Sequence, residues 1–219
     1  MGVRRIGVMG GMFDPVHNAH IEAAKVAIEV LQLDALNMVP CHVPNHRQEA
    51  HASAEDRLQM LRLATAQIPK VLVDDRECRR DGVSYTVDTL AQMANEYPGA
   101  MLVLVLGIDA FATLPKWHHW QAIFALANVL VLDRPDVQAK IDPDLEMDLQ
   151  YREVSSVDRF FSVPQGRIWR LPEPKLKISS TSVRESLQSN KQSSAQIPAA
   201  VADYIRTNAL YQNTAQSKD

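Results

Sequence analysis

The sequence predicts an α/β fold with a doubly wound parallel sheet of five or six strands and a small helical part near its C-terminal end. Short apolar runs alternate along the chain with segments of helical period, as in repeated strand–helix–strand units. The run from Ala100 to Leu106 is apolar throughout, which is typical of a central strand buried on both faces. Gly10-Gly11 follows the first apolar run and precedes a helical segment, which predicts a tight turn at the carboxyl end of the first strand.

The composition is that of one folded domain. The chain has 219 residues, of which 46% are hydrophobic, enough to bury a substantial core. We expect a single domain over residues 1–212, with the helical part at about 179–212, and a polar tail over 213–219. The formal net charge of −3 argues against nucleic-acid binding, and no apolar run is long enough to span a membrane. Two isolated cysteines and the absence of a signal-peptide pattern predict a cytoplasmic protein.

The order of the elements predicts a Rossmann-like sheet. A strand from Arg4 to Met9, an amphipathic helix from Ile21 to Leu33 and a strand from Ala35 to Val39 form the first unit. Further strands are expected at 71–73, 100–106, 129–132 and 167–171, and further helices after Ser53, after Ser84, over 114–127 and over 199–209. The charged run 74–81 is predicted to be a solvated loop, and residues 135–165 an irregular excursion or lid.

The turn after the first strand has the sequence GGMFDPVHNAH, which predicts an anion site. Glycines let backbone N–H groups approach an anion, and a helix start adds further N–H donors and the positive end of the helix dipole. His17 and His20 stand three apart at the helix start, so both can face one anion. From the residues alone, two exposed histidines on a fortuitous helix face are an open alternative. A zinc pair is another, although it would need ligands that do not accompany these histidines.

A second stretch, ISSTSVR at residues 178–184, has hydroxyl residues before a helical segment. Such a run supplies an N-cap and several N–H donors. Arg184, one turn into the helix, can direct its guanidinium at the same anion. Taken by itself, a Ser/Thr cap before a helix is usually a structural feature.

Both stretches resemble motifs of the nucleotidyltransferase superfamily, whose members are related to the class I tRNA synthetases. GGMFDPVHNAH is similar to the GGxFDPxHxGH signature, with Ala19 where glycine is usual, and ISSTSVR is similar to the ISSTxxR element. The remaining segments, in their order, resemble the bacterial nicotinate mononucleotide adenylyltransferase family over nearly the whole chain apart from 135–165. These segments are PCHVPNHR, ASAEDRLQML, GVSYTVDTL, GIDAFATLPKWHHW, VLDRP and PAAVADYIRTNALY.

The resemblance implies an adenylyltransferase of NAD biosynthesis. Such an enzyme joins ATP and nicotinate mononucleotide to give nicotinate adenine dinucleotide (deamido-NAD) and pyrophosphate, by direct in-line attack without a covalent enzyme intermediate. The attacking phosphate oxygen is already ionised, so catalysis depends on positioning two anions and neutralising charge. The implied partners are ATP and nicotinate mononucleotide, with no nucleic acid and no membrane. Mg²⁺ would be held mainly by phosphates and water, and we expect a monomer or a weak homo-oligomer.

The resemblance also implies site residues. The implied catalytic residues are His17, His20 and Arg184. The implied ATP-binding residues are Gly10, Gly11, Met12, Phe13, His17, His20, Ser180, Thr181 and Arg184. The implied substrate-binding residues are His46, Arg47, Tyr85, Thr86, Asp109, Trp117, His118 and Arg134, and no residue is assigned to a metal. Arg47 stands where the family usually has lysine, so a planar fork replaces a point charge there.

Several of these residues have specific expected roles. The N–H of Thr86, at a helix start, and His118 are expected to receive the carboxylate of the substrate ring. Trp117 is expected to stack on the pyridine ring, with a core aromatic as the alternative, and Asp109 to bind ribose hydroxyls, with a helix cap as the alternative. Asp14 is expected to be a turn or cap residue and not a catalytic acid.

Other functions remain alternatives at this point. The enzyme could use nicotinamide mononucleotide or phosphopantetheine, although phosphopantetheine adenylyltransferases are shorter and lack the SYTVDTL and KWHHW elements. Acid is favoured over amide, because an amide would set its NH₂ against the N–H of Thr86 and leave polar atoms unpaired. A non-catalytic nucleotide sensor is the alternative from another class, since fold does not decide function.

Overall fold

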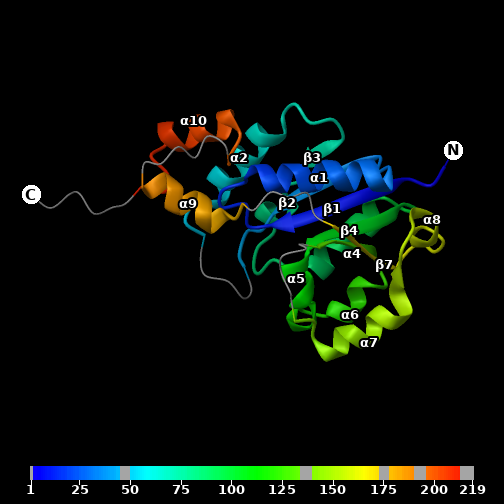
Figure 1. Cartoon of the computed structure of the whole chain (residues 1–219). Helices are drawn as coiled ribbons and strands as arrows, with labels where there is room; N and C mark the ends of the chain where they lie inside the picture. Colours follow the sequence, from blue (N-terminus) through cyan, green and yellow to red (C-terminus); the bar gives the residue numbers. More distant parts are fainter. Residues whose placement is uncertain (1, 45–49, 134–139, 173–177, 190–195, 213–219) are drawn as a thin grey trace, which may run out of the picture.

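The computed structural model describes residues 2–44, 50–133, 140–172, 178–189 and 196–212. These form one sheet with helices on both faces (Figure 1), in the strand order β3-β2-β1-β4-β5-β7-β6, and all neighbouring strands are parallel. The strands are β1 (Arg5–Gly11), β2 (Ala35–Pro40), β3 (Val71–Val73), β4 (Met101–Gly107), β5 (Asn128–Asp133), β6 (Glu153–Val154) and β7 (Ile168–Pro172). The predicted Rossmann-like α/β fold is confirmed, with seven strands in place of the five or six expected.

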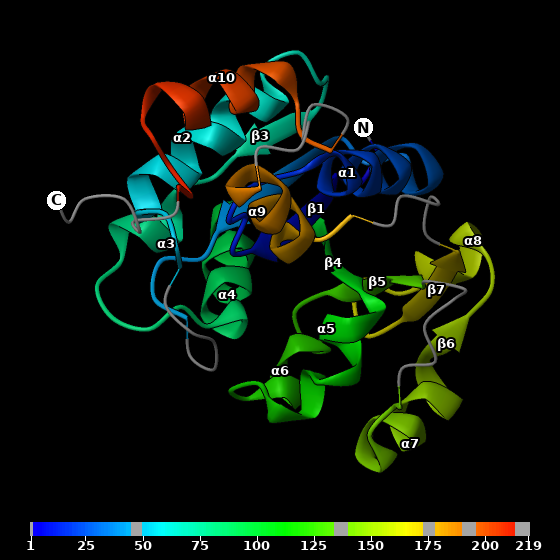
Figure 2. The same ribbon diagram turned by 60° about the vertical axis from the view of Figure 1, so that its left-hand side comes forward.

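Helices cover the two faces of the sheet as separate layers. Figures 1 and 2 show α1, α2, α9 and α10 over one face and α4 to α7 over the other. The helices are α1 (Asn18–Leu31), α2 (Ala54–Thr65), α3 (Arg76–Arg79), α4 (Thr86–Glu96), α5 (Ile108–Ala112), η1 (Leu114–Lys116, a 3₁₀ turn), α6 (Trp120–Ile123), α7 (Pro143–Arg152), α8 (Val157–Phe160), α9 (Ser180–Gln188) and α10 (Ala199–Thr207).

Each face of the sheet has its own hydrophobic core, as alternation along β4 shows. Val103 and Val105 pack with residues of α1 and α2, whereas Leu102, Leu104 and Leu106 pack with residues of α4, α5 and α6. All five side chains are buried. The prediction of a central strand buried on both faces is therefore confirmed.

The chain order determines where a ligand crevice can form. The chain builds β1, β2 and β3 outward in one direction and then returns to add β4 on the other side of β1. The connections that leave the carboxyl ends of β1 and β4 therefore diverge, and open α/β sheets bind ligands at such a switch point. The tight turn predicted at Gly10-Gly11 is wrong, because both glycines pair with β2 as the last residues of β1. The glycines, which end β1, and Asp109, which follows β4, both lie at this edge.

The charged run 74–81 was predicted to be a solvated loop, and this prediction is wrong in part, because α3 forms inside it. The side chain of Arg76 is 9% exposed; its Nε donates to Asp74 Oδ2 at 2.7 Å and its Nη2 to Glu96 Oε2 at 2.8 Å. Glu77 is also buried. A charged side chain can be buried when it pairs with carboxylates. The pairing with Glu96 on α4 is a tertiary contact, which the number of charged residues in the run does not predict.

The single helix predicted over 114–127 is also wrong. The 3₁₀ turn η1 and the short helix α6 are separated by His119, which adopts a left-handed conformation with φ of 48°. A helix cannot pass through a left-handed residue. The break turns the chain so that Trp120 packs, 8% exposed, in the core on the α4 side.

Residues 135–165 were predicted to be an irregular excursion or lid. For residues 140–165, which the structure describes, this prediction is wrong. This segment contains α7, β6 and α8, and Leu145, Leu149 and Phe160 are buried. β6 pairs with β7 and supplies the additional strand at the sheet edge. Residues 140–165 are thus a packed extension of the sheet.

The helices near the C-terminal end join the core of the α1 face. Val183 of α9 and Val201 and Ile205 of α10 belong to the same buried cluster as the residues of α1. This packing supports the interpretation of one domain over residues 1–212, which we retain as a proposal. Among the described helices, none combines the length and the apolar character that a bilayer span requires.

Candidate active site

The end of β1 and the turn that follows it leave backbone exposed to open space. Gly11, the last residue of β1, accepts a hydrogen bond from Cys41 N at 2.9 Å through its carbonyl, so the end of β1 is attached to the loop after β2. A Cβ on Gly11 would lie 3.0 Å from the Phe13 ring, whereas a Cβ on Gly10 would meet nothing within 4 Å. Phe13 is buried with φ of 48°. Glycine at position 11 thus lets Phe13 fold back under the turn, while Gly10 borders open space at the strand end.

The two histidines meet at the start of α1. His17 is the N-cap residue and His20 lies in the first turn; their ring centroids are 3.7 Å apart with 21° between the planes. His17 N donates to His20 Nδ1 at 3.3 Å, and the Phe13 ring packs edge-on against His20 at 5.0 Å. His17 is buried and His20 is half-buried. The predicted shared face of the two rings is confirmed.

The start of α9 lies against this turn (Figure 2). Ser180 Oγ donates to Pro15 O at 3.1 Å, and Arg184 Nη1 donates to Asp14 O at 2.7 Å. Arg184 Nη2 also donates to Thr181 Oγ1 at 3.3 Å. Two motifs separated by 165 to 170 residues in the sequence therefore share one edge of the sheet. Histidine rings, hydroxyl groups, a guanidinium and helix-start N–H groups are together suited to bind phosphate.

Asp14 is buried, 4% exposed, and joins several segments. Its Oδ2 accepts from His51 N at 2.8 Å and lies 3.1 Å from His51 Nδ1, while its Oδ1 accepts from Ala52 N at 3.1 Å and from the Tyr211 hydroxyl at 2.8 Å. Burial acts to raise the pKa of this carboxyl, but the hydrogen bonds from His51, Tyr211 and Ala52 outweigh burial, so the pKa lies below its ordinary value. The ionised carboxylate anchors the turn, which agrees with the expected structural role.

Arg57 of α2 is a buried cation beneath the same turn. It is 1% exposed, and its Nη1 donates to Met12 O at 2.8 Å and to Cys41 O at 2.7 Å, while its Nε donates to Ala52 O at 3.3 Å. One guanidinium thus ties the turn after β1 to the loop after β2 and to the segment before α2. Carbonyl groups satisfy it, as burial of a cation requires.

The start of α4 forms the second half of the site. Tyr85 is the N-cap residue and Thr86 the first helical residue. The His118 ring lies 4.2 Å from the Tyr85 ring, and the His119 ring lies 4.0 Å from that of His118. Trp117, just before His118, is half-buried beside the core on this face. Tyr85, Thr86, Trp117 and His118 are thus brought into one neighbourhood, as the resemblance implied, and Asp109 is exposed in the first turn of α5.

Ser84 attaches this second half to the rest of the crevice. Its Oγ accepts from His42 N at 3.2 Å, and its N donates to Val43 O at 2.9 Å. Beneath it, buried Glu77 accepts a hydrogen bond from Thr89 Oγ1 at 2.7 Å, and burial raises the pKa of Glu77. The loop after β2 is therefore in contact both with the turn after β1, through Cys41, and with the start of α4.

Some of the implied residues cannot be placed. His46, Arg47 and Arg134 lie outside the described residues. Among the residues that the structure describes, no group of three or more His, Cys, Asp and Glu side chains could hold a metal ion.

Sequence reasoning did not find Arg57, His51 and Tyr211 as residues near the site. For Arg57 a signal existed, because it stands on the apolar face of α2. The buried residues of α2 are Arg57, Leu58, Met60, Leu61, Ala64 and Thr65. A charged residue at an apolar-face spacing is a candidate for a buried, paired group.

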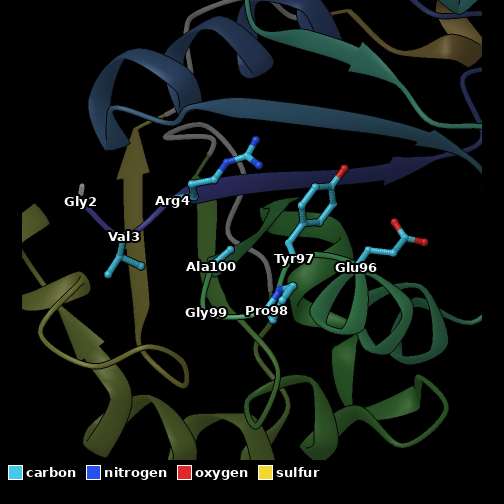
Figure 3. Close-up of a pocket in the computed structure, with 8 residues that line it drawn as sticks. All are labelled: Gly2, Val3, Arg4, Glu96, Tyr97, Pro98, Gly99 and Ala100. Atoms are coloured by element: carbon cyan, nitrogen blue, oxygen red, sulfur yellow. The ribbon is translucent and has the colours of Figure 1, made fainter.

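A hollow of about 300 Å³ lies elsewhere (Figure 3). Gly2 to Arg4 and Glu96 to Ala100 line it, and the Arg4 guanidinium lies 5.5 Å from the centre of the Tyr97 ring. These residues precede β1 and β4, so the hollow is at the amino ends of the strands. It is at the edge opposite to the two motifs and is not the candidate site.

Comparison with known proteins identifies the family. The model of the cytidylyltransferase-like family matches residues 8–186, a range that includes both motifs. A probable nicotinate-nucleotide adenylyltransferase from Chromohalobacter salexigens is 41% identical over 209 residues, 94% of this chain and 95% of the relative. The chain belongs to this family, among its nicotinate-nucleotide adenylyltransferases. Another such adenylyltransferase, from Pseudomonas fluorescens, is 42% identical over 212 residues, 95% of this chain and 97% of the relative.

A solved structure shares the adenylyltransferase fold. The nicotinic acid mononucleotide adenylyltransferase of Plasmodium falciparum, in complex with NaAD, matches with a TM-score of 0.72 and 19% identity over 95% of this chain and 97% of that chain. This likeness shows the fold. The predicted membership of the nicotinate-nucleotide adenylyltransferases is confirmed by the relatives, and the roles of individual site residues stay predictions.

Proposed function

We propose that the chain transfers the adenylyl group of ATP to nicotinate mononucleotide, producing nicotinate adenine dinucleotide and pyrophosphate for NAD synthesis. The convergence of the two motifs carries this proposal, above all the 2.7 Å contact of Arg184 Nη1 with the carbonyl of Asp14, three residues before the stacked histidines begin. A phosphate oxygen of the mononucleotide attacks the α-phosphorus, the α–β bridging bond breaks, and its electron pair leaves with pyrophosphate.

The phosphate side would stabilise charge on ATP. His17 and His20 donate toward the phosphates, with His20 nearest the α-phosphate, and a neutral imidazole retains one N–H for this purpose. Ser180, Thr181 and Arg184 hold the β- and γ-phosphates. Each such donor, positioned before the reaction, is worth about 3 kcal/mol of barrier, judged from the removal of single oxyanion donors in other enzymes.

The pyridine side would select the acceptor. The N–H of Thr86 at the start of α4 and the exposed His118 receive the carboxylate, and Trp117 stacks on the ring. Asp109, exposed at the carboxyl end of β4, accepts from ribose hydroxyls. The carboxylate is favoured over the amide, because an amide NH₂ would face an N–H donor.

Nucleotidyltransferases that use ATP generally need a divalent metal ion. The described donors near the ATP side are imidazole, hydroxyl and guanidinium groups, and the Asp14 carboxylate is already engaged by N–H and O–H donors. These donors suit the binding of phosphate. The ligands of Mg²⁺ would therefore be mainly phosphate oxygens and water, which Mg²⁺ prefers. Mg²⁺ supplies charge neutralisation on the triphosphate. A monomer or weak homo-oligomer in the cytoplasm stays a prediction.

The proposed function is tested by pyrophosphate release from the purified chain with Mg·ATP. The acceptors, tested separately, are nicotinate mononucleotide, nicotinamide mononucleotide and phosphopantetheine. We expect release with the nicotinate compound well ahead of the others. Comparable release with the amide would overturn the account of Thr86, and ATP binding without release with any acceptor would indicate a sensor.

A further inference from the structure

The segment after α10 reaches the candidate active site through one side chain. Tyr211 is 9% exposed, and its hydroxyl donates to Asp14 Oδ1 at 2.8 Å across 197 residues of sequence. Burial, together with the negative charge of Asp14, raises the pKa of Tyr211, so the hydroxyl keeps its proton and remains a donor. The residue that receives this hydrogen bond lies inside the histidine motif.

Asp14 makes contacts through both its side chain and its main chain. Its Oδ1 accepts from the Tyr211 hydroxyl and from Ala52 N, and its Oδ2 accepts from His51 N. Its main-chain carbonyl accepts Arg184 Nη1 at 2.7 Å, and the same Nη1 lies 3.9 Å from Oδ2. The main chain and the carboxylate of Asp14 therefore both bear on where the Arg184 guanidinium is held. Loss of the Tyr211 hydroxyl would leave Oδ1 with the hydrogen bond from Ala52 N, so the carboxylate would be held less firmly beside Arg184 Nη1.

We propose that Tyr211 is a positioning residue for adenylyl transfer, which fixes Asp14 and through it the Arg184 guanidinium that faces the ATP phosphates. This inference rests on the proposed function in assigning phosphate binding to Arg184. The turn after α10 then serves the reaction as well as the core. A shift of about 1 Å in a positioned group can cost two orders of magnitude in rate. The hydrogen bond from Tyr211 to Asp14 can therefore affect the rate through the position of Arg184, although Tyr211 itself does not contact the phosphates.

The chain contains a matched control for this contact. Tyr204 of α10 also donates its hydroxyl to a carboxylate oxygen, Asp56 Oδ1, at 2.9 Å. Asp56 lies in the first turn of α2, where its other oxygen contacts the N-cap residue Ser53. Tyr204 and Tyr211 thus make the same kind of bond from the same segment, but only Tyr211 bonds to Asp14.

The test compares Tyr211→Phe with Tyr204→Phe, each of which removes one hydroxyl and keeps the ring. For Tyr211→Phe we expect kcat/KM for ATP to fall about tenfold or more, with a raised KM for ATP and a KM for nicotinate mononucleotide within about twofold of wild type. Tyr204→Phe should leave all three constants within about twofold. A fall in apparent kcat with both KM values unchanged and a proportionate loss of binding sites for an ATP analogue would indicate a smaller active fraction and overturn the proposal. An equal loss in Tyr204→Phe would do the same.

A double-mutant cycle tests whether Tyr211 acts through Arg184. In an Arg184→Lys background, Tyr211→Phe should cost much less than in the wild type, because the guanidinium fork that Asp14 holds is already gone. An equal fold-loss in both backgrounds would overturn the proposal. Calorimetric binding of a non-hydrolysable ATP analogue gives the same cycle without turnover. A wild type that binds the analogue but releases no pyrophosphate would refute the proposed function, while the binding cycle would still decide the role of Tyr211.

Discussion

On the phosphate side of the candidate site, functional groups are held by hydrogen bonds between segments far apart in the chain, whereas on the pyridine side they project from exposed turns. Arg184 is held by the backbone of a turn 170 residues earlier, and buried Arg57 fixes that turn from below. His118 and His119, by contrast, are exposed; the His118 ring contacts Tyr85, and the His119 ring contacts His118.

The difference agrees with the role that we propose for each side. Stabilising a charged transition state requires donors that do not reorganise, and hydrogen bonds to buried backbone provide such rigidity. Selecting an acceptor depends on a few contacts to one ring, which short turns at the ends of β4 and α4 can supply. Substitutions on the phosphate side should therefore affect the chemical step and the binding of ATP. Substitutions on the pyridine side should affect the choice and affinity of the acceptor.

The largest expected effect is on the phosphate side. His20→Ala should lower kcat by about 10²- to 10³-fold, because it removes a donor to the α-phosphate during transfer. The thermal unfolding midpoint should stay close to that of the wild type, since His20 is only half-buried. Initial rates of pyrophosphate release and a melting curve measure both quantities. A near-normal rate would refute the assigned role.

On the pyridine side, Thr86→Pro removes the N–H proposed to receive the carboxylate and leaves the helix start intact. Proline is tolerated at the first helical position, and Tyr85 before it is in the extended region that proline requires, with φ of −116° and ψ of 130°. The preference for nicotinate over nicotinamide mononucleotide should fall about tenfold, as the ratio of kcat/KM values. Thr86→Ala, which keeps the N–H, is the control, and an unchanged ratio in the proline variant would rule out this contact.

The next effect, similar to or smaller than that of Thr86→Pro, concerns the proposed stacking of Trp117 on the pyridine ring. Trp117→Ala should raise the KM for the pyridine nucleotide about five- to tenfold and leave that for ATP nearly unchanged, since base–aromatic stacking contributes about 1–3 kcal/mol. Trp120→Ala is not a suitable control, because Trp120 is in the core. Equal changes in both KM values would contradict the separation of the two sides.

The smallest effect is a pH dependence of stability. The Asp14 carboxyl has its pKa lowered from an ordinary value of 3.8, so its stabilising contribution is present above that value and is lost as the pH falls through the folded-state pKa. Asp14→Asn should lower the free energy of unfolding at pH 7 by about 1–2 kcal/mol. The difference from wild type should shrink when denaturation is repeated below about pH 4. A difference that stays constant with pH would show that charge is not the cause.

The sequence alone was sufficient to predict elements whose structure depends mainly on residues close together in the chain. The apolar run of β4, the amphipathic α1 and the hydroxyl cap of α9 all formed as predicted. The sequence was insufficient where contacts with residues far away in the chain determine the local structure. The run 74–81 contains α3, where Arg76 pairs with Glu96 on α4, and the helix after 114 breaks at His119, before Trp120 in the core.

The same division holds within the site. Sequence by itself determined the parallel sheet, the histidine pair and the Arg184 element, because each is indicated by a pattern of neighbouring residues. Gly10 and Gly11, predicted as a turn, extend β1 because they pair with Val39 and Pro40 of β2. Only the tertiary structure decided that Arg184 meets Asp14, that Arg57 lies buried under Met12, and that Tyr211 closes on Asp14. Such contacts join residues 45 to 197 positions apart, and the folded sheet alone brings them together.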